Sequence, residues 1–262
     1  MKEHFKKIPG LVWFYRLLKS PFRKLREINT AKVARRDFER APVIASSEDG
    51  DQELVRIENL LRYTKTSGSQ YSALEFPGGY HTIEVNGRVF EGQRNPLMRL
   101  DDLPFSLEGK RVLDIGCNQG GMLFAIGEKI KWGVGVDYDP KMVNAANKIK
   151  SVMSRVDLSF YVFDIDGDPH GLIYDFIPEP EVDVVFLLSV AMWVDCWKDL
   201  VLECAKLSSC MVFETNGSPE QQRGQYEYLY SVYSEVNQVS DSSVDDPKQR
   251  RRRLYVCSQP RR

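Results

Sequence analysis

The sequence predicts an α/β fold in which helices cover both faces of a doubly wound, mostly parallel sheet, with a helical extension at the N-terminus. Three observations lead to this prediction. From residue 110 onward, short apolar runs alternate with amphipathic segments of helical length. Two of these runs end in an acidic residue, and the first leads directly into a glycine-rich turn. Of the 262 residues, 42% are hydrophobic, which is enough to bury a core and excludes disorder throughout.

The N-terminal segment, residues 1–40, has the pattern of a basic amphipathic helix. Its large apolar residues recur at steps of three and four, namely Leu11, Phe14, Tyr15, Leu18, Phe22 and Leu25. The segment holds 12 Lys and Arg against 4 Asp and Glu. This combination is typical of a helix that lies on an anionic membrane surface. Packing of the apolar stripe on the protein's own domain, or on a dimer partner, is the alternative.

The rest of the chain divides into a lead-in and a core. We expect the basic helical extension at 1–45, a lead-in of helix and hairpin at 46–108 that contributes to the functional site, and the core at 109–262. The lead-in begins with a helix at Gln52–Lys65, and an Asn-Gly turn follows a short strand near Gly87. The core strands are predicted at Arg111–Ile115, Gly133–Asp137, Leu158–Phe163, Val182–Leu188, Cys210–Glu214 and Leu254–Cys257. The core helices are predicted at Gly120–Lys129, Pro140–Met153, Cys196–Leu207 and Pro219–Tyr233.

Composition excludes several kinds of site and partner. Residues 41–247 carry 17 Lys and Arg against 33 Asp and Glu, and so acidic a body disfavours a nucleic-acid partner. Five cysteines without a Cys-x-x-Cys spacing, with only three histidines, predict a reduced, cytoplasmic protein without a metal site. The Asp-x-Asp-x-Asp pattern at 164–168 imitates a calcium loop, but a proline follows where glycine is required. The longest apolar run, Val184–Val194, is 11 residues long, whereas a membrane span needs ~20.

The glycine-rich turn carries the strongest functional signal. Asp114 lies near the end of the first core strand, and Gly116, Asn118 and Gly120 follow it in the turn. Glycine lets the backbone pass close to a ligand, and open α/β sheets bind ligands beyond the carboxyl ends of their strands. Asp137 ends the next strand, 23 residues after the first acid. A carboxylate in that place accepts hydrogen bonds from both hydroxyls of a ribose, so the two acids predict a cofactor that contains a nucleoside.

The details of the turn favour S-adenosylmethionine (SAM) over a dinucleotide or a nucleoside triphosphate. The middle position of the dinucleotide pattern is not glycine, and no Gly-Lys-Ser/Thr sequence follows. The carboxylate of Asp114 would repel a pyrophosphate, whereas it would attract the ammonium group of an amino acid.

Residues 80–257 resemble the class I SAM-dependent methyltransferases. The motifs that carry the resemblance are the run at 112–120, the Gly-Val-Asp-Tyr-Asp-Pro run at 135–140, Phe-Asp-Ile at 163–165 and the apolar run at 182–190. The resemblance implies a Rossmann-like, seven-stranded sheet. It also implies that SAM contacts the following residues: Asp114, Gly116, Asn118, Gly120, Asp137, Tyr138, Asp164, Ile165 and Leu188.

A narrower resemblance includes the lead-in. Tyr80, His81 and Arg99, in this order before the glycine turn, are similar to the methyltransferase half of bacterial O-antigen chain-terminating kinase/methyltransferases and to tRNA wobble-uridine carboxymethyltransferases. It implies that these three side chains contact SAM, with the arginine clamping the methionine carboxylate. The chain departs from the O-antigen enzymes at 191–193, where Ala-Met-Trp replaces histidines.

The acceptor and the base follow less directly from the sequence. We expect O-methylation of a glycan or glycolipid in bacterial envelope polysaccharide synthesis. The basic N-terminal helix would then hold the enzyme at the inner membrane. The alternatives are an RNA or small-molecule acceptor, or a non-catalytic subunit with the same fold. Glu214 and His81 are the candidate general bases. The alternative for Glu214 is a carboxylate that caps a helix or binds backbone, and the alternative for His81 is cofactor binding.

Overall fold

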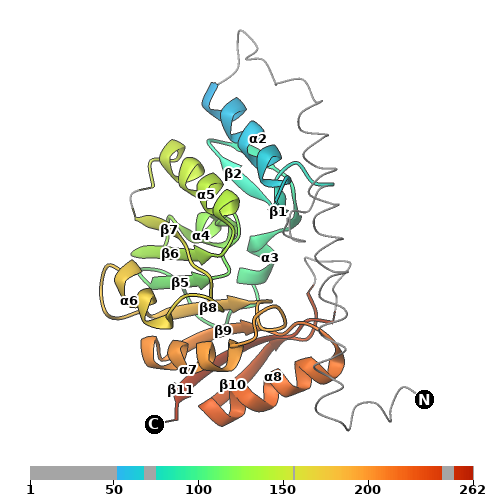
Figure 1. The fold of residues 1–262 in the computed structure, drawn as a ribbon, viewed down its shortest axis with the longest axis vertical. Helices are drawn as coiled ribbons and strands as arrows, with labels where there is room; N and C mark the ends of the chain where they lie inside the picture. The colour runs from blue at the N-terminus through green and yellow to red at the C-terminus, as the bar shows by residue number, and fades with distance from the viewer. Residues whose placement is uncertain (1–51, 68–74, 156, 244–250, 262) are drawn as a thin grey trace, which may run out of the picture.

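The computed structural model describes residues 52–67, 75–155, 157–243 and 251–261. The predicted extension at 1–45 lies outside the described residues. The core is a seven-stranded sheet in the order β10-β11-β9-β8-β5-β6-β7 (Figure 1). Its strands are β5 Arg111–Ile115, β6 Trp132–Asp137, β7 Leu158–Val162, β8 Val184–Leu188, β9 Cys210–Glu214, β10 Tyr233–Ser240 and β11 Leu254–Pro260.

The sheet is mostly parallel, as predicted. Strands β7, β6, β5, β8 and β9 pair in parallel, so their carboxyl ends meet at one edge of the sheet. Strand β11 is antiparallel to both β9 and β10. Its first residue, Leu254, therefore pairs with the last residue of β9, Glu214. This register brings the residues just before β11 to the edge where the parallel strands end.

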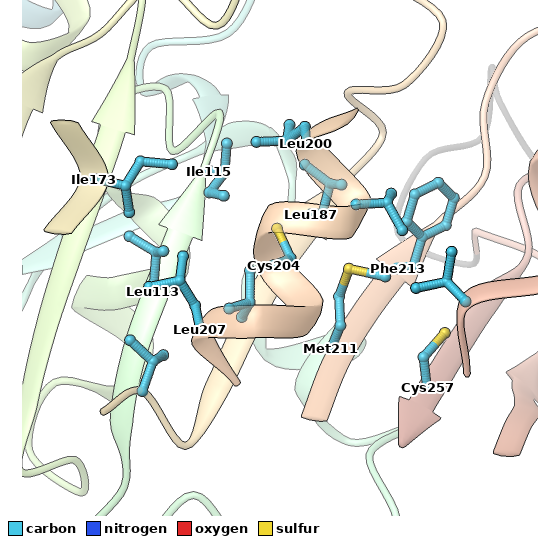
Figure 2. Close-up of a cluster of buried hydrophobic side chains, with 14 of the residues drawn as sticks. Leu113, Ile115, Ile173, Leu187, Leu200, Cys204, Leu207, Met211, Phe213 and Cys257 are labelled. Carbon is cyan, nitrogen blue, oxygen red and sulfur yellow. The ribbon is translucent and has the colours of Figure 1, made fainter. Parts of the chain in front are cut away.

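Helices cover both faces of the sheet because alternate strand residues point to opposite faces. The side chains of Leu113 and Ile115 pack with α6 Ile173–Phe176, α7 Trp197–Leu207 and α8 Pro219–Val232 in one buried cluster. Figure 2 shows part of this cluster, with α7 lying across the strands. The intervening positions of the strands pack in a second cluster, together with helices of the other face: α2 Gln52–Thr64, α4 Gly121–Ile126 and α5 Pro140–Val152.

The lead-in forms short strands and one short helix beside α2. They are β1 Gly79–His81, β2 Ile83–Val85, β3 Arg88–Phe90, β4 Gly92–Arg94 and α3 Pro96–Leu100. Strands β2 and β3 form a hairpin, and β1 pairs in parallel with β4. The hairpin turn has φ of 49° at Asn86 and 79° at Gly87, the left-handed pair that a tight Asn-Gly turn requires.

The structure differs from the prediction mainly at β10. The helix predicted at Pro219–Tyr233 ends at Val232 in the structure. The next eight residues form β10, a strand that was not predicted. Strand β10 lies at the edge of the sheet and pairs with β11 alone. Its buried residues, Tyr233 and Val236, are three positions apart, so the two-residue alternation that marks a strand is missing. No helix in the described part of the chain is long and apolar enough to cross a membrane.

Candidate functional site

The glycine turn after β5 adopts a conformation that only small residues tolerate. Gly116 and Gly120 have φ of 81° and 79°, in the left-handed region. A Cβ on Gly116 would lie 2.6 Å from a methyl carbon of Val190, and one on Gly120 would lie 2.6 Å from the ring of Phe160. Both glycines are therefore required by backbone conformation and by close packing. The turn holds backbone amides at the carboxyl edge of the sheet, where the ligand was predicted.

The carboxylate of Asp137 is held in place by this turn. One oxygen accepts a hydrogen bond from the Asn118 amide, and the other accepts one from the Asp139 amide, both at 2.9 Å. The side chain is 8% exposed. Burial raises the pKa of Asp137 to about 6, although the two amides oppose the shift. Each oxygen keeps a second lone pair, so the fixed carboxylate can accept two further hydrogen bonds.

Asp114 is a buried carboxylate that lacks a partner on one oxygen. It is 2% exposed, and Oδ2 has no hydrogen bond to any described residue. Burial raises its pKa to about 7, with Arg99 opposing the shift and Asp137 adding to it. A buried carboxylate without a partner is costly, so this position favours a cationic or hydrogen-bonding ligand group.

Helix α2 is tied to the turns that follow β5 and β6. The side chain of Gln119 donates to Thr64 Oγ1 at 2.8 Å, at the C-terminal end of α2. Just beyond the helix, Ser67 donates to Asp139, and Lys141 Nζ donates to a threonine hydroxyl at 2.6 Å. These contacts place the lead-in against the same edge of the sheet as the two acids.

His81 and Tyr80 lie on β1, where the Tyr80 hydroxyl accepts a hydrogen bond from Arg94 at 3.1 Å. His81 is 4% exposed, and neither ring nitrogen has a hydrogen-bond partner among the described residues. Its ring packs against Gly121, where an added Cβ would lie 2.3 Å from the Cβ of His81. Burial lowers the pKa of His81 well below its usual value, and the charges of Arg99 and Arg94 lower it further. The imidazole is therefore neutral at physiological pH.

Glu214, at the end of β9, lies among three arginines. Arg94 donates to its two carboxylate oxygens at 2.9 and 3.2 Å, and Arg99 donates to Oε2 at 2.5 Å. A guanidinium nitrogen of Arg252 lies 3.8 Å from Oε2. All four side chains are at most 6% exposed. We call these residues, Arg94, Arg99, Arg252 and Glu214, the arginine cluster.

Hydroxyl groups complete the surroundings of Glu214. Ser189, just after β8, donates to Oε2, and Ser243 donates to Oε1 at 3.1 Å. Ser189 in turn accepts from Arg252 at 3.0 Å. Burial by itself would raise the pKa of Glu214, but Arg99 and Arg94 hold it at about 2. A carboxylate so strongly paired is a poor proton acceptor at neutral pH, which disfavours Glu214 as a general base. Among the described residues, its carboxylate accepts from arginine and serine side chains, not from a helix end or the backbone as in the alternative.

The structure thus brings together most, though not all, of the residues expected to contact SAM. Asp114, Gly116, Asn118, Gly120 and Asp137 converge on one turn. Tyr138 is 56% exposed, and Asp164 is exposed in the loop after β7. Ile165 and Leu188 are half-buried and pack against the two core clusters. Arg99, which is expected to clamp the cofactor carboxylate, donates to Glu214, and its charge also acts on Asp114.

The acidic residues that imitate a calcium loop form hydrogen bonds within the protein. Asp166 accepts from the amides of Asp195 and Cys196, before α7, and Asp168 accepts from the Asp164 amide at 2.8 Å. No group of three or more metal-binding side chains occurs within the described ranges.

Several members of the site were not anticipated from the sequence. They are Arg94, Ser189, Ser243 and Arg252. Arg252 belongs to a run of four arginines at 250–253 that comes directly before β11. Within this run Arg251 and Arg253 are exposed, whereas Arg252 is buried. The sequence did hold a signal for this: in an extended segment that leads into a strand, successive side chains point to opposite faces, so one arginine of the run could have been expected to point inward.

Comparison with known proteins finds a methyltransferase domain family and solved structures that are similar to this chain. Residues 113–209 match the family described as a methyltransferase domain. The U6 snRNA methylphosphate capping enzyme Amus of Drosophila melanogaster is 34% identical over 113 residues, which cover 37% of this chain and 36% of that protein. The chain therefore spans about a third of the length of this curated relative.

Two solved structures are also similar. The N-terminal domain of EvdMO1, solved with SAH bound, has a TM-score of 0.56 at 13% identity, over 83% of this chain and 100% of that one. WbdD in complex with a kinase inhibitor has a TM-score of 0.46 at 20% identity, over 62% of this chain and 38% of that one. The likeness to EvdMO1 shows a shared fold. The predicted resemblance to class I SAM-dependent methyltransferases is confirmed.

Proposed function

We propose that this chain, whose residues 113–209 match the methyltransferase domain family, is a class I SAM-dependent enzyme that transfers a methyl group from SAM to an oxygen atom of its acceptor. The observation that carries the proposal is the pair of buried acids on the glycine turn. Asp114 offers a carboxylate oxygen that no described residue contacts by a hydrogen bond, and Asp137 offers two fixed oxygens 23 residues further along the chain. The solved relative EvdMO1 binds SAH, the product that SAM leaves after methyl transfer.

The residues at the turn fit SAM chemically. Asp114 would hold the ammonium group, and Asp137 would accept hydrogen bonds from the ribose hydroxyls. Gly116 and Gly120 leave room for the cofactor to approach the backbone. Tyr80 and His81 would cover the reacting group and exclude water. When bound, SAM supplies an electrophilic methyl group on a sulfonium, and the protein contributes mainly orientation, which can lower a barrier by ~7–11 kcal/mol.

For an acceptor hydroxyl, we assign the base to His81 in preference to Glu214. Neither ring nitrogen of this neutral imidazole has a hydrogen-bond partner among the described residues, so one of them is free to accept a hydrogen bond from the acceptor hydroxyl. The carboxylate of Glu214 is engaged by arginines and has a pKa of about 2. An acceptor that is already ionised would need no base.

We propose a glycan or glycolipid of the bacterial envelope as the acceptor. Support comes from the resemblance of Tyr80, His81 and Arg99 to the O-antigen enzymes, and from the basic amphipathic pattern of residues 1–40. The second candidate is the end of an RNA, favoured by the local identity to an enzyme named for capping U6 snRNA with a methylphosphate. The acidic balance of residues 41–247 counts against RNA.

Binding and turnover test the proposal in sequence. Calorimetry with S-adenosylhomocysteine should show binding that Asp137→Ala weakens, and absence of binding by the folded protein would refute the proposal. Transfer of radiolabelled methyl groups to extracted envelope glycolipids, compared with transfer to RNA, then distinguishes the two acceptors.

The membrane role is tested separately by flotation. We expect the full chain to float with anionic vesicles, and a variant lacking residues 1–40 to remain unbound. Salt should weaken the attraction, because the screening length falls from ~10 Å at 0.1 M to ~3 Å at 1 M. Equal behaviour of the two proteins would exclude membrane binding through this segment.

A further inference from the structure

We propose that the side-chain oxygen of Gln119 binds the ammonium group of SAM, as a second acceptor beside Asp114. The inference rests on the proposed function, since it assigns a further contact to the cofactor of that reaction. Gln119 lies in the glycine turn between Asn118 and Gly120, and its side chain is 1% exposed. It was not among the residues predicted to contact SAM.

The orientation of the Gln119 amide follows from Thr64, the last residue of α2. The Thr64 hydroxyl donates to the Leu61 carbonyl at 2.6 Å, so its hydrogen is engaged and its oxygen is left to accept. Gln119 Nε2 donates to this oxygen at 2.8 Å. The reverse orientation would place two acceptors against each other. The amide nitrogen therefore points to α2, and the amide oxygen, Oε1, points away from it.

This oxygen has no hydrogen-bond partner among the described residues. Gln225, the other buried glutamine in the described part of the chain, uses both ends of its amide. It accepts from the Asn216 amide and donates to the Asn216 carbonyl, both at 3.0 Å. A buried acceptor without a partner costs free energy, so Gln119 Oε1 favours a ligand that supplies a donor.

The neighbours of Gln119 place this oxygen between the glycine turn and β1. The amide lies against Gly79, where an added Cβ would be 2.9 Å from Nε2 and 3.0 Å from Oε1. Two residues further along β1, the ring of His81 packs on Gly121 in the same turn. The proposed function places Tyr80 and His81 over the reacting group of SAM. Because that group belongs to the methionine half, Oε1 lies on the side of the turn that would receive this half.

The donors of SAM single out its ammonium group. The two ribose hydroxyls are already assigned to the two oxygens of Asp137, and the adenine amino group is at the opposite end of the cofactor from the methionine. The ammonium group carries three N–H donors, of which Oδ2 of Asp114 accepts one. Gln119 Oε1 supplies a second acceptor on the same turn. It adds no charge beside Asp114, whose pKa burial and Asp137 already raise.

The test measures by calorimetry how strongly the protein discriminates the amino group of its ligand. The probes are S-adenosylhomocysteine and its deaminated analogue, in which hydrogen replaces the amino group. The ratio of their dissociation constants, analogue over parent, reports on this group, because a general loosening of the turn weakens both probes by the same factor. We expect Gln119→Met, which keeps the length of the side chain but has no amide oxygen, to lower the ratio roughly tenfold or more.

Two further variants serve as controls. Gln225→Met removes two hydrogen bonds from a glutamine that is equally buried but lies on α8, so it should leave the ratio within about twofold of the wild type. Gln119→Glu keeps an acceptor oxygen and should raise the ratio, because a carboxylate attracts an ammonium group more strongly than a neutral amide does. This variant also tests the inference if Gln119→Met fails to fold.

The outcomes separate this inference from the proposed function. An unchanged ratio in Gln119→Met would overturn the inference, even if both probes bind more weakly, because Gln119 would then act on the turn and not on the amino group. Equal falls of the ratio in Gln119→Met and Gln225→Met, or a fall in Gln119→Glu, would overturn it as well. Absence of S-adenosylhomocysteine binding by the folded wild type would instead refute the proposed function, and this inference with it.

Discussion

Replacement of Glu214 by glutamine should destabilise the fold far more than the loss of an ordinary carboxylate. Glutamine has nearly the same shape as glutamate but carries no charge, and its amide N–H groups would face the N–H groups of the surrounding arginines. The variant would leave Arg94, Arg99 and Arg252 buried without the carboxylate that they surround. Removing one partner of a buried ion pair typically costs ~3–5 kcal/mol, because the other charge is left uncompensated.

The pKa of Glu214 gives an independent magnitude. The folded value of about 2 lies below the ordinary value of 4.5. Each pKa unit corresponds to about 1.4 kcal/mol, so ionised Glu214 contributes on the order of 3 kcal/mol to stability. Because the folded pKa is depressed, this contribution is fully present above pH 4.5 and is lost as the pH falls toward 2. The difference between the wild type and Glu214→Gln should therefore shrink across this window.

Thermal and urea unfolding followed by circular dichroism measure the effect. A loss of ~3–5 kcal/mol should lower the Tm by about 6–20 °C in a domain of this size. Glu227→Gln is the matched control, because Glu227 is 69% exposed and lies 4.0 Å from a single arginine on α8. That change should stay within about 0.5 kcal/mol. Equal Tm values for the two variants at pH 7 would refute the interpretation of the cluster as a buried ionic core.

Three further variants test the cofactor site. Asp137→Ala should weaken S-adenosylhomocysteine binding more than tenfold by calorimetry, since two charge-assisted hydrogen bonds at a fixed carboxylate are lost, and unchanged affinity would remove the ribose role. The wild-type affinity should fall as the pH drops below about 7, where Asp114 becomes protonated, and Asp114→Asn should flatten this dependence. Without cofactor, ionised Asp114 destabilises the folded protein, because burial disfavours its charge. Asp114→Asn should therefore raise the Tm of the free protein at pH 8. Gly120→Ala should cost about 1–3 kcal/mol of stability through its φ of 79° and the close ring of Phe160, whereas Gly171→Ala, in open space, should be nearly neutral.

The parts of the fold that could be predicted depend on neighbours in the sequence. The Asn-Gly pair at 86–87 required positive φ at two adjacent residues, and the structure has it. Helix α8 begins at a capping box formed by Ser218 and Gln221, three residues apart. The predicted boundaries of these core strands and helices differ from those in the structure by at most three residues, because the apolar spacing that marks each element is local. Strand β10 escaped prediction because its burial depends on one partner strand at the edge of the sheet.

The glycine turn was likewise evident from the sequence, because its acid, its glycines and the following helix are consecutive. The arginine cluster was not, because its members come from distant segments. Arg94 and Arg99 lie 120 and 115 residues before Glu214, and Arg252 reaches it only through the antiparallel register of β11. A sequence shows where charges occur, but not which of them share a buried site. The strand order decided that, since it brought three arginines to one carboxylate in a place from which water is largely excluded.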